Sequence, residues 1–120
     1  MSSESKRKGS LFENQIEQWL LDSGLDAQRL PRAGAKDIGD VHVRIKGDEY
    51  LVIECKNVKR VDLNEWIRQS EVESANHQAR YGRPTHPLVI HKARGKSIDQ
   101  ARVTMTLGSF VEFLRHREIV

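Results

Sequence analysis

Apolar residues recur at helical spacing near the start of the chain, as they do in a helix that buries one face. These residues are Phe12, Ile16, Trp19 and Leu20. Ser10 and Glu13 have the spacing of a capping box, in which each side chain binds a free backbone amide of the first turn. Gly24 is typical of the position at which a helix ends. The pattern predicts a helix from Ser10 to about Gly24, preceded by a flexible basic arm over residues 1–9.

Residues 41–56 alternate between apolar and polar side chains, which is typical of strands that bury one face in a sheet. Two apolar rows flank a turn signal at Gly47-Asp48. Pairing these rows sets Val43 opposite Ile53. The segment is therefore expected to form a hairpin with a three-residue loop over residues 47–49.

The other face of this hairpin is polar. The expected register places Asp40 opposite Lys56 and His42 opposite Glu54, all on that face. A two-residue turn would instead throw Asp40 onto the face away from Glu54, because a slip of one residue flips every side chain. Burial of the apolar rows is therefore expected to bring Asp40, Glu54 and Lys56 together.

The second half of the chain carries alternating helix and strand signals. A helix is expected from the Asp62 cap to about Tyr81, where Gly82 ends it. Its apolar positions form a thin stripe: Leu63, Trp66, Ile67, Ala75 and Ala79. A buried strand over residues 87–91 follows, parallel to the preceding strand because a helical crossover joins them. Another short strand covers residues 103–107, and a final helix begins at Ser109.

With a short strand over residues 25–32, the elements follow the order α-β-β-β-α-β-β-α. That order predicts an α/β fold with a mixed β-sheet flanked by helices. A length of 120 residues and a hydrophobic content of 38% fit one domain. Residues 10–120 are expected to form it.

Several classes of protein are excluded by composition. The longest apolar runs, residues 51–53 and 88–90, are far too short to cross a bilayer. The N-terminus lacks the apolar core of a signal peptide. The lone cysteine, Cys55, excludes an intrachain disulfide and a multi-cysteine zinc site. The chain is expected to be soluble and intracellular, in the cytoplasm or on the nucleoid, whether a cell or a phage encodes it.

Lys and Arg number 20 against 17 Asp and Glu, which gives a net charge of +3. This balance permits a polyanionic partner without requiring one. The distribution is more informative, because basic clusters stand at the start of the chain and after two expected strands. They are Lys6 to Lys8, Lys56 with Lys59 and Arg60, and Lys92 with Arg94 and Lys96. Three clusters at the ends of elements favour a basic face over scattered solvated charges.

The candidate chemistry lies at Asp40 and in the sequence Glu54-Cys55-Lys56. Two carboxylates on neighbouring strands can hold Mg²⁺, which takes few protein oxygens and keeps several waters. The cation polarises a phosphate and lowers the pKa of its water, and a lysine on the same strand face neutralises developing charge. Surface strands also alternate Glu and Lys as solvated pairs, so the bare pattern has low specificity. Here the pair directly follows the buried run of residues 50–53, where charges need partners.

Three stretches give the chain a more specific likeness. They are Lys8 to Glu13, Arg29 to Gly34, and Gly39-Asp40 with Glu54 to Asn57. In this order they resemble the PD-(D/E)XK nuclease superfamily, and most closely its archaeal-type Holliday junction resolvases. The resemblance implies a restriction-endonuclease-like fold and a Mg²⁺-dependent endonuclease, for which Mn²⁺ can substitute. It further implies a homodimer acting on branched DNA, the four-way junction, in DNA recombination and repair.

The same resemblance assigns roles to residues by position. Asp40 and Glu54 would be metal ligands, Glu13 would complete the acidic site, and Lys56 would be the catalytic lysine. The phosphodiester would be hydrolysed by a metal-activated water, leaving 5′-phosphate and 3′-hydroxyl ends. The expected DNA contacts are Arg7, Lys8, Ser10, Arg32, Lys59 and Arg60.

The chain departs from the family pattern before the aspartate, and its loop over residues 33–36 lacks the serine that some relatives carry there. Gly39 stands where the family usually has proline before the aspartate, and Asp37 is a competing ligand three residues before Asp40. The capping box with Ser10 would by itself account for a glutamate at position 13, without a role in the acidic site. Alternatives therefore remain: a nuclease of the same fold, of phage or restriction type, acting on duplex, flapped or single-stranded DNA, or a DNA-binding module without catalysis.

The remaining polar candidates are read as surface residues. His42 is expected to be exposed polar surface near Glu54. Four further histidines have no zinc-like spacing and are expected at the surface or on phosphates: His77, His86, His91 and His116. Gln69 and Gln78 are assigned to a solvated helix face. Trp19 and Trp66 are expected in the core or an interface, and the final helix is expected to offer apolar dimer surface through Phe110, Phe113 and Leu114, near Ile119 and Val120.

Overall fold

The fold is described by a computed structural model that covers residues 3–31 and 36–117. Its helices are α1 (Ser3–Asp22), α2 (Leu63–Tyr81) and α3 (Leu107–Arg115), with a short 3-10 turn η1 (Ile98–Gln100). Its strands are β1 (Asp26–Arg29), β2 (Val41–Ile45), β3 (Glu49–Lys56), β4 (Thr85–His91) and β5 (Arg102–Thr104). The expected α/β class and element order are confirmed, with η1 as an addition. None of the helices in the described ranges is long and apolar enough to span a membrane.

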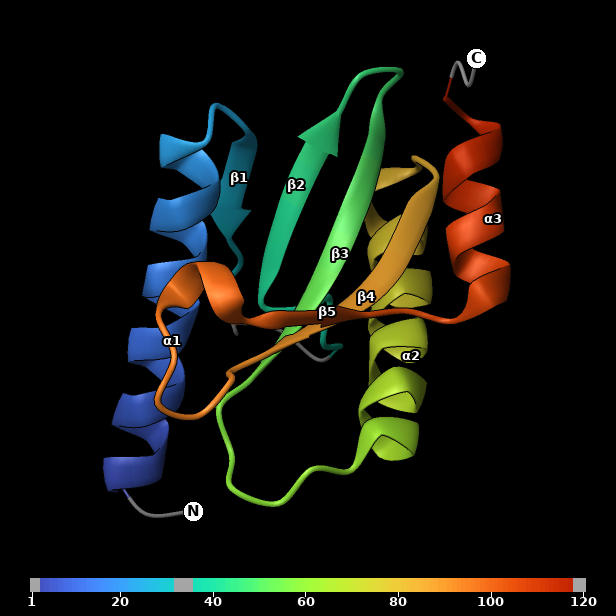
Figure 1. The fold of residues 1–120 in the computed structure, drawn as a ribbon. Helices are drawn as coiled ribbons and strands as arrows, with labels where there is room; N and C mark the ends of the chain where they lie inside the picture. Colours follow the sequence, from blue (N-terminus) through green and yellow to red (C-terminus); the bar gives the residue numbers. More distant parts are fainter. Residues whose placement is uncertain (1–2, 32–35, 118–120) are drawn as a thin grey trace.

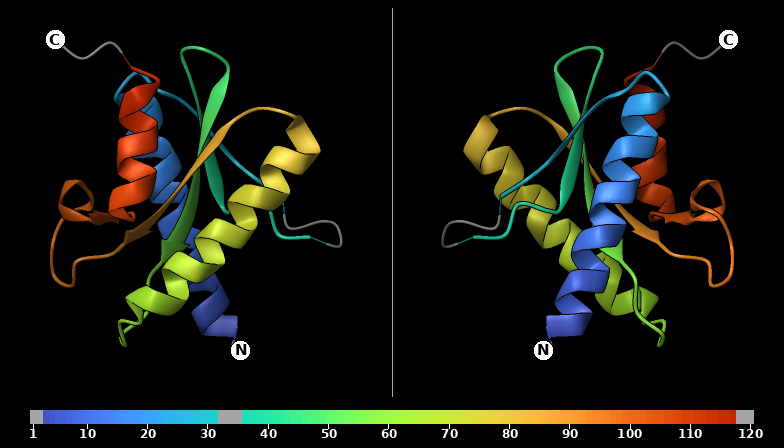
Figure 2. Two further views of the ribbon diagram at one scale, coloured as in Figure 1. Left: turned by 90° about the vertical axis from the view of Figure 1, so that its right-hand side faces the viewer. Right: turned by 90° about the vertical axis from the view of Figure 1, so that its left-hand side faces the viewer.

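The five strands form one mixed sheet in the order β1-β2-β3-β4-β5 (Figure 1). Only β3 and β4 pair in parallel among the described strands, and α2 is the crossover between them, as expected. Helix α2 covers one face of the sheet, whereas α1 and α3 cover the other (Figure 2). The carboxyl end of β3 therefore lies between a helix on each side.

The two faces of the sheet differ in polarity. The main apolar core lies on the α1 side: Phe12, Ile16, Ala27, Val41, Val43, Ile53, Leu88 and Ile90. Helix α2 instead buries a largely polar face: Trp66, Ser70, Glu73, Ser74 and His77. Ala75 and Ala79 of the expected apolar stripe are exposed. The apolar pattern thus misplaced the buried face of α2, because short polar and ionisable side chains occupy it.

Helix α1 begins at Ser3, two turns before the expected start at Ser10. Residues 3–9, which were expected to form a flexible arm, are helical. Glu, Lys and Arg propagate a helix well, and Glu4 in the first turn complements the helix dipole. Ser10 is therefore an interior residue of the helix, and the capping box predicted for it with Glu13 is wrong.

The hairpin of β2 and β3 is shifted by two residues from the expected register. Val43 pairs with Leu51 and His42 with Val52, so the expected pairing of His42 with Glu54 and the placement of Asp40 opposite Lys56 are wrong. The cause is Glu49, which begins β3 instead of closing the loop.

The Glu49 carboxylate is buried in a cluster of cationic and imidazole partners. It lies 2.6 Å from His86 Nε2, and Arg117 Nη1 donates to it over 2.9 Å. These contacts keep Glu49 in the strand, and the turn falls on Lys46, Gly47 and Asp48. A shift of two residues leaves every side chain on its expected face.

Two histidines expected at the surface are buried. His86 packs beside Glu49, and His77 of α2 has no exposed surface. His77 Nε2 lies 2.8 Å from His42 Nδ1, and both imidazoles stack among the rings of Tyr50 and Tyr81. His42 is therefore also an interior residue, and this ring cluster joins α2 to the first strands of the sheet.

We expect the free energy of unfolding to fall as the pH drops from about 6.5 to about 4. Burial, with a smaller contribution from the charge of His42, lowers the pKa of His77 to about 4. The unfolded chain binds the proton first, at the ordinary histidine pKa, so protonation favours unfolding across this window by roughly 1–3 kcal/mol. Urea unfolding near neutral pH and near pH 5 measures the difference, which should shrink in His77→Phe. An unchanged pH response in that variant would contradict the assignment.

Candidate metal centre

A cleft of about 970 Å³ opens at the carboxyl end of β3, between α1 and α2. All four residues predicted to be catalytic line it: Glu13, Asp40, Glu54 and Lys56. They come from α1, the segment before β2, and β3. The structure therefore gathers the predicted set from three parts of the chain.

Glu54 and Lys56 lie at the carboxyl end of β3, on the face of the sheet that α2 covers. Glu54 is 8% exposed, and its Oε1 lies 3.8 Å from Lys56 Nζ. A carboxylate this deep is stabilised by a nearby positive charge, since desolvation disfavours an isolated buried ion. The lysine is thus held at the mouth of the cleft beside the acidic residue.

Asp40 is fixed to the end of β3 through its backbone and its side chain. Its amide donates to the Ile53 carbonyl over 3.0 Å, and its carbonyl accepts from the Leu30 amide over 2.9 Å. Its Oδ2 accepts a hydrogen bond from the Cys55 amide over 2.9 Å. The carboxylate therefore caps the strand end while lining the cleft.

Gly39 explains the first departure from the family pattern. Its φ of +99° is open to glycine and closed to proline, whose ring fixes φ near −65°. A Cβ at this position would lie 2.8 Å from Val52 Cγ1. The turn brings Asp37 toward the sheet, where its Oδ1 accepts from the Gly39 amide and its carbonyl accepts from the Asn76 side chain of α2.

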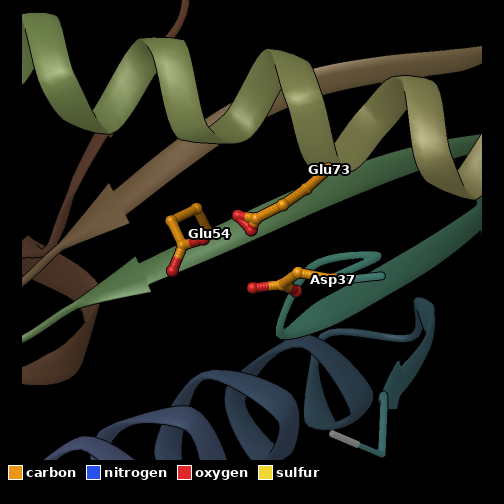
Figure 3. Close-up of side chains that lie close together, drawn as sticks. All are labelled: Asp37, Glu54 and Glu73. Atoms are coloured by element: carbon orange, nitrogen blue, oxygen red, sulfur yellow. The ribbon is translucent and has the colours of Figure 1, made fainter. Parts of the chain in front are cut away.

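Asp37, Glu54 and Glu73 converge in the cleft. Each offers a carboxylate oxygen, and these atoms all lie within 4.8 Å of one another (Figure 3). Asp40 lines the same cleft but does not belong to this group. Glu73, which comes from the inner face of α2, was missed, because its place in the sequence follows neither the strand alternation nor the apolar stripe. Its spacing of seven residues from the buried Trp66 could have placed it on the inner face.

Glu13 lies at the α1 wall of the cleft and is 4% exposed. Arg29 Nη2 of β1 lies 3.4 Å from its Oε1, and Arg29 Nη1 donates to Asn14 over 2.7 Å. The guanidinium offsets the cost of burying the carboxylate. Glu13 thus has an inward position instead of the capping role that its spacing suggested.

Basic residues line the walls of the cleft. Of the predicted DNA contacts, Lys8, Lys59 and the polar Ser10 line the cleft, joined by Lys6 and Arg68, which were not predicted as contacts. Arg7 and Arg60 are exposed but are not among the lining residues. Arg32 lies outside the described residues, as do Ile119 and Val120.

The donor set fits a hard divalent cation. The converging atoms are carboxylate oxygens, which Mg²⁺ and Ca²⁺ prefer. Among the described residues, no thiolate or imidazole belongs to this converging group. Gln69 also lines the cleft, and its Oε1 is buried with no hydrogen-bond partner among the described residues. The expectation of a solvated face is therefore wrong for Gln69, whereas Gln78 is exposed.

The fold and the site together define a class. A mixed sheet with a central parallel pair, an aspartate before β2 and a Glu-x-Lys end to β3 is the arrangement of a PD-(D/E)XK nuclease. A family model described as archaeal Holliday junction resolvase (Hjc) matches residues 4–108. The chain belongs to this family, whose members are junction-resolving nucleases that use divalent metals.

Comparison with solved structures agrees on the fold. The structure of Archaeoglobus fulgidus Hjc, described as a Holliday junction resolvase from an archaeal hyperthermophile, is similar with a TM-score of 0.50 and 21% sequence identity. The alignment covers 76% of this chain and 73% of that chain. A search of curated proteins gave no match.

We expect Gly39→Ala to lower the free energy of unfolding by about 1–3 kcal/mol, because the new Cβ meets Val52 in a left-handed backbone conformation. Gly9→Ala is the control: Gly9 is inside α1 with nothing within 4 Å of its added Cβ, so helix propensity should raise stability by about 0.5–1 kcal/mol. Urea denaturation of both variants measures the two changes. Equal stability of Gly39→Ala and wild type would contradict the tight approach.

Proposed function

We propose that this chain is an endodeoxyribonuclease that cuts four-way DNA junctions with Mg²⁺, or with Mn²⁺ in its place. The observation that carries the proposal is the placement of Glu54 and Lys56 beside Asp40 in one cleft, within a chain of the junction-resolvase family. The carboxylates supply the metal ligands and the lysine supplies a positive charge at the same strand end. Both are needed for hydrolysis of a phosphodiester.

Asp40 and Glu54 would hold the cation, with Glu13 completing the acidic set. A bound cation would polarise the phosphodiester and lower the pKa of water at the site. The chain's own contribution is to fix these carboxylates before the substrate arrives. Asp40 is tied to the Cys55 amide and Glu13 is held near Arg29, so neither has to reorganise for the reaction.

Lys56 would act on the reacting phosphate. Its ammonium lies 3.8 Å from Glu54, at the strand end that opens into the cleft. From there it can donate a hydrogen bond to a phosphate oxygen and neutralise the negative charge that develops as water attacks. It can also orient the attacking water beside Glu54.

The walls of the cleft would bind the DNA backbone. Lys6 and Lys8 come from α1, Lys59 follows β3, and Arg68 comes from α2, so positive charge lies on both sides of the acidic site. Phosphates bound on either wall would bring the phosphodiester between them to the carboxylates. Such contacts make binding weaken as salt concentration rises. Arg7, Ser10, Arg32 and Arg60 complete the proposed contacts.

We further propose a homodimer, because a four-way junction offers two equivalent strands and a two-fold dimer matches them. Four apolar residues of β5 and α3 are exposed in the chain: Val103, Leu107, Phe110 and Val111. Phe113 packs instead against His86 and Arg117. The proposed dimer surface is therefore the first turns of α3 with β5, which keeps Phe110 from the surface expected from the sequence but leaves out Phe113 and Leu114.

Glu54→Gln should abolish cleavage while leaving the fold intact. The wild type, incubated with a labelled four-way junction and Mg²⁺, should give symmetric paired nicks that bear 5′-phosphate ends, and EDTA should prevent them. Loss of a metal ligand and its charge should lower the cleavage rate at least about a hundredfold. Glu71→Gln, an exposed change on α2, is the matched control and should cut as the wild type does.

Flapped, duplex and single-stranded DNA run in parallel identify the substrate. Cleavage of one of these in preference to the junction would replace the junction with that substrate and keep the nuclease. Binding to the junction without cutting in Mg²⁺ or Mn²⁺ would contradict catalysis and leave a DNA-binding module.

Leu107→Glu combined with Phe110→Glu should convert the dimer to a monomer, because both side chains are exposed and charge there would be buried on association. Sedimentation velocity measures the change. Leu11→Glu, at another exposed apolar position on α1, is the control and should stay dimeric. A double variant that sediments as a dimer would place the interface elsewhere.

A further inference from the structure

Three exposed cations lie on the segment that joins β4 to η1, outside the cleft. They are Lys92, Arg94 and Lys96, and none of them is among the residues that line the cleft. In the described part of the chain, none of the three forms an ion pair with a carboxylate. The acidic residue nearest in sequence, Asp99, is bonded instead to Ser97 and Gln100. This segment therefore presents positive charge to whatever approaches it.

These cations belong to residues 92–97, the basic loop, whose backbone is fixed at both ends. The Lys92 amide donates to the Lys56 carbonyl over 3.0 Å, which joins the start of the loop to the end of β3. The Lys96 amide donates to the Ala93 carbonyl over 3.1 Å and closes a turn in which Gly95 has a φ of +70°. A backbone that is already ordered loses less entropy when it binds a partner. The basic loop is thus prepared to bind an anionic partner.

The basic loop and the segment after β3 start from neighbouring strand ends and then diverge. Strands β3 and β4 are paired, so the two segments begin side by side next to Lys56. The segment after β3 carries Lys59 and Arg60 and runs to α2, whereas the basic loop runs toward α1 (Figure 1). Helices α1 and α2 cover opposite faces of the sheet. Two basic segments therefore leave one point beside the acidic site in two directions.

Contacts with α1 place the basic loop beside the cleft but outside it. Lys92 and Lys96 line a small cavity of about 160 Å³ together with Phe12 and Gln15 of α1. Lys8 precedes Phe12 by four residues and so lies on the same face of α1, and it also lines the cleft. Positive charge therefore continues from the cleft, around α1, to the basic loop.

We propose that the basic loop binds the phosphate backbone of a second arm of branched DNA, while the cleft holds the arm that is cut. The inference rests on the proposed function and identifies the part of the chain that distinguishes a junction from a linear duplex. Arms leave a branch point in different directions, and two diverging basic segments match two such arms. A linear duplex has a single axis and, when it lies in the cleft, leaves the basic loop unoccupied.

The chemistry of the basic loop fits a phosphate backbone. Lysine and arginine side chains carry only hydrogen-bond donors, and duplex DNA presents one negative charge for about every 1.7 Å of its axis. Contacts of this kind hold the DNA in position without reading its bases. Recognition by the basic loop would therefore depend on the shape of the substrate and not on its sequence.

Binding measured in EDTA, where cleavage cannot interfere, tests the assignment. Fluorescence anisotropy of the full chain with a labelled four-way junction, and with a linear duplex of the same arm sequence, gives both affinities over a range of salt concentrations. Arg94→Gln combined with Lys96→Gln should weaken junction binding about tenfold and lower its salt slope by about 2, because two phosphate contacts are lost. Duplex binding should change by less than about twofold.

Two further double variants serve as controls. Lys46→Gln combined with Arg83→Gln removes two exposed charges near the opposite end of β3, and it should leave both affinities unchanged. Arg94→Lys combined with Lys96→Arg keeps the charge of the basic loop and should bind the junction nearly as the wild type does. The second control separates the loss of charge from a disturbance of the turn.

Equal losses of affinity for the junction and the duplex would overturn the assignment, because the basic loop would then lie on the path of a single duplex. Unchanged junction affinity in Arg94→Gln with Lys96→Gln would overturn it as well. In either case, cleavage of the junction by the wild type in Mg²⁺ would leave the proposed nuclease standing. A wild type that binds the junction no better than the duplex, and cuts neither, would overturn both.

Discussion

The feature on which the rest of the structure depends is the crowding of negative charge at the carboxyl end of β3. Asp37, Glu54 and Glu73 come from three elements and hold carboxylate oxygens within 4.8 Å of one another. Asp37 is exposed, but Glu54 and Glu73 are buried, and desolvation and repulsion both oppose gathering like charges there. The fold imposes the arrangement, and Lys56 beside Glu54 offsets part of the repulsion. A bound divalent cation would offset more of it.

The two faces of the sheet differ in what they bury: one carries the apolar core and the other carries most of the candidate site. On the α1 and α3 side, the apolar core supplies the hydrophobic burial that drives folding. On the α2 side, buried polar groups replace part of that core: the acidic residues at one end and the ring cluster around His77 at the other. Strand β3 has side chains on both faces of the sheet. The register in which it pairs with β2 and β4 places its apolar residues in the core, and the same register fixes where Glu54 and Lys56 stand in the cleft. A single strand thus couples the stability of the domain to the geometry of the site.

The sequence predicted features that follow from periodicity and missed those that depend on distant partners. Strand alternation put Glu54 and Lys56 on the right face, and the crossover rule made β3 and β4 parallel. The hairpin register was two residues off, because the turn pattern does not reveal that Glu49 is held by His86 and Arg117. The inner face of α2 was missed for the same reason: its polar residues are buried against partners far away in the sequence. The resemblance to the resolvase family pointed to Asp40, Glu54 and Lys56, which line the cleft, but it did not point to Glu73.

The most direct test of the central claim is anomalous diffraction from crystals of the wild-type protein grown with Mn²⁺. A cation that serves phosphodiester hydrolysis should give an anomalous peak in the cleft, within coordination distance of Glu54. Ordered crystals with saturating Mn²⁺ and no peak at the end of β3 would contradict the account.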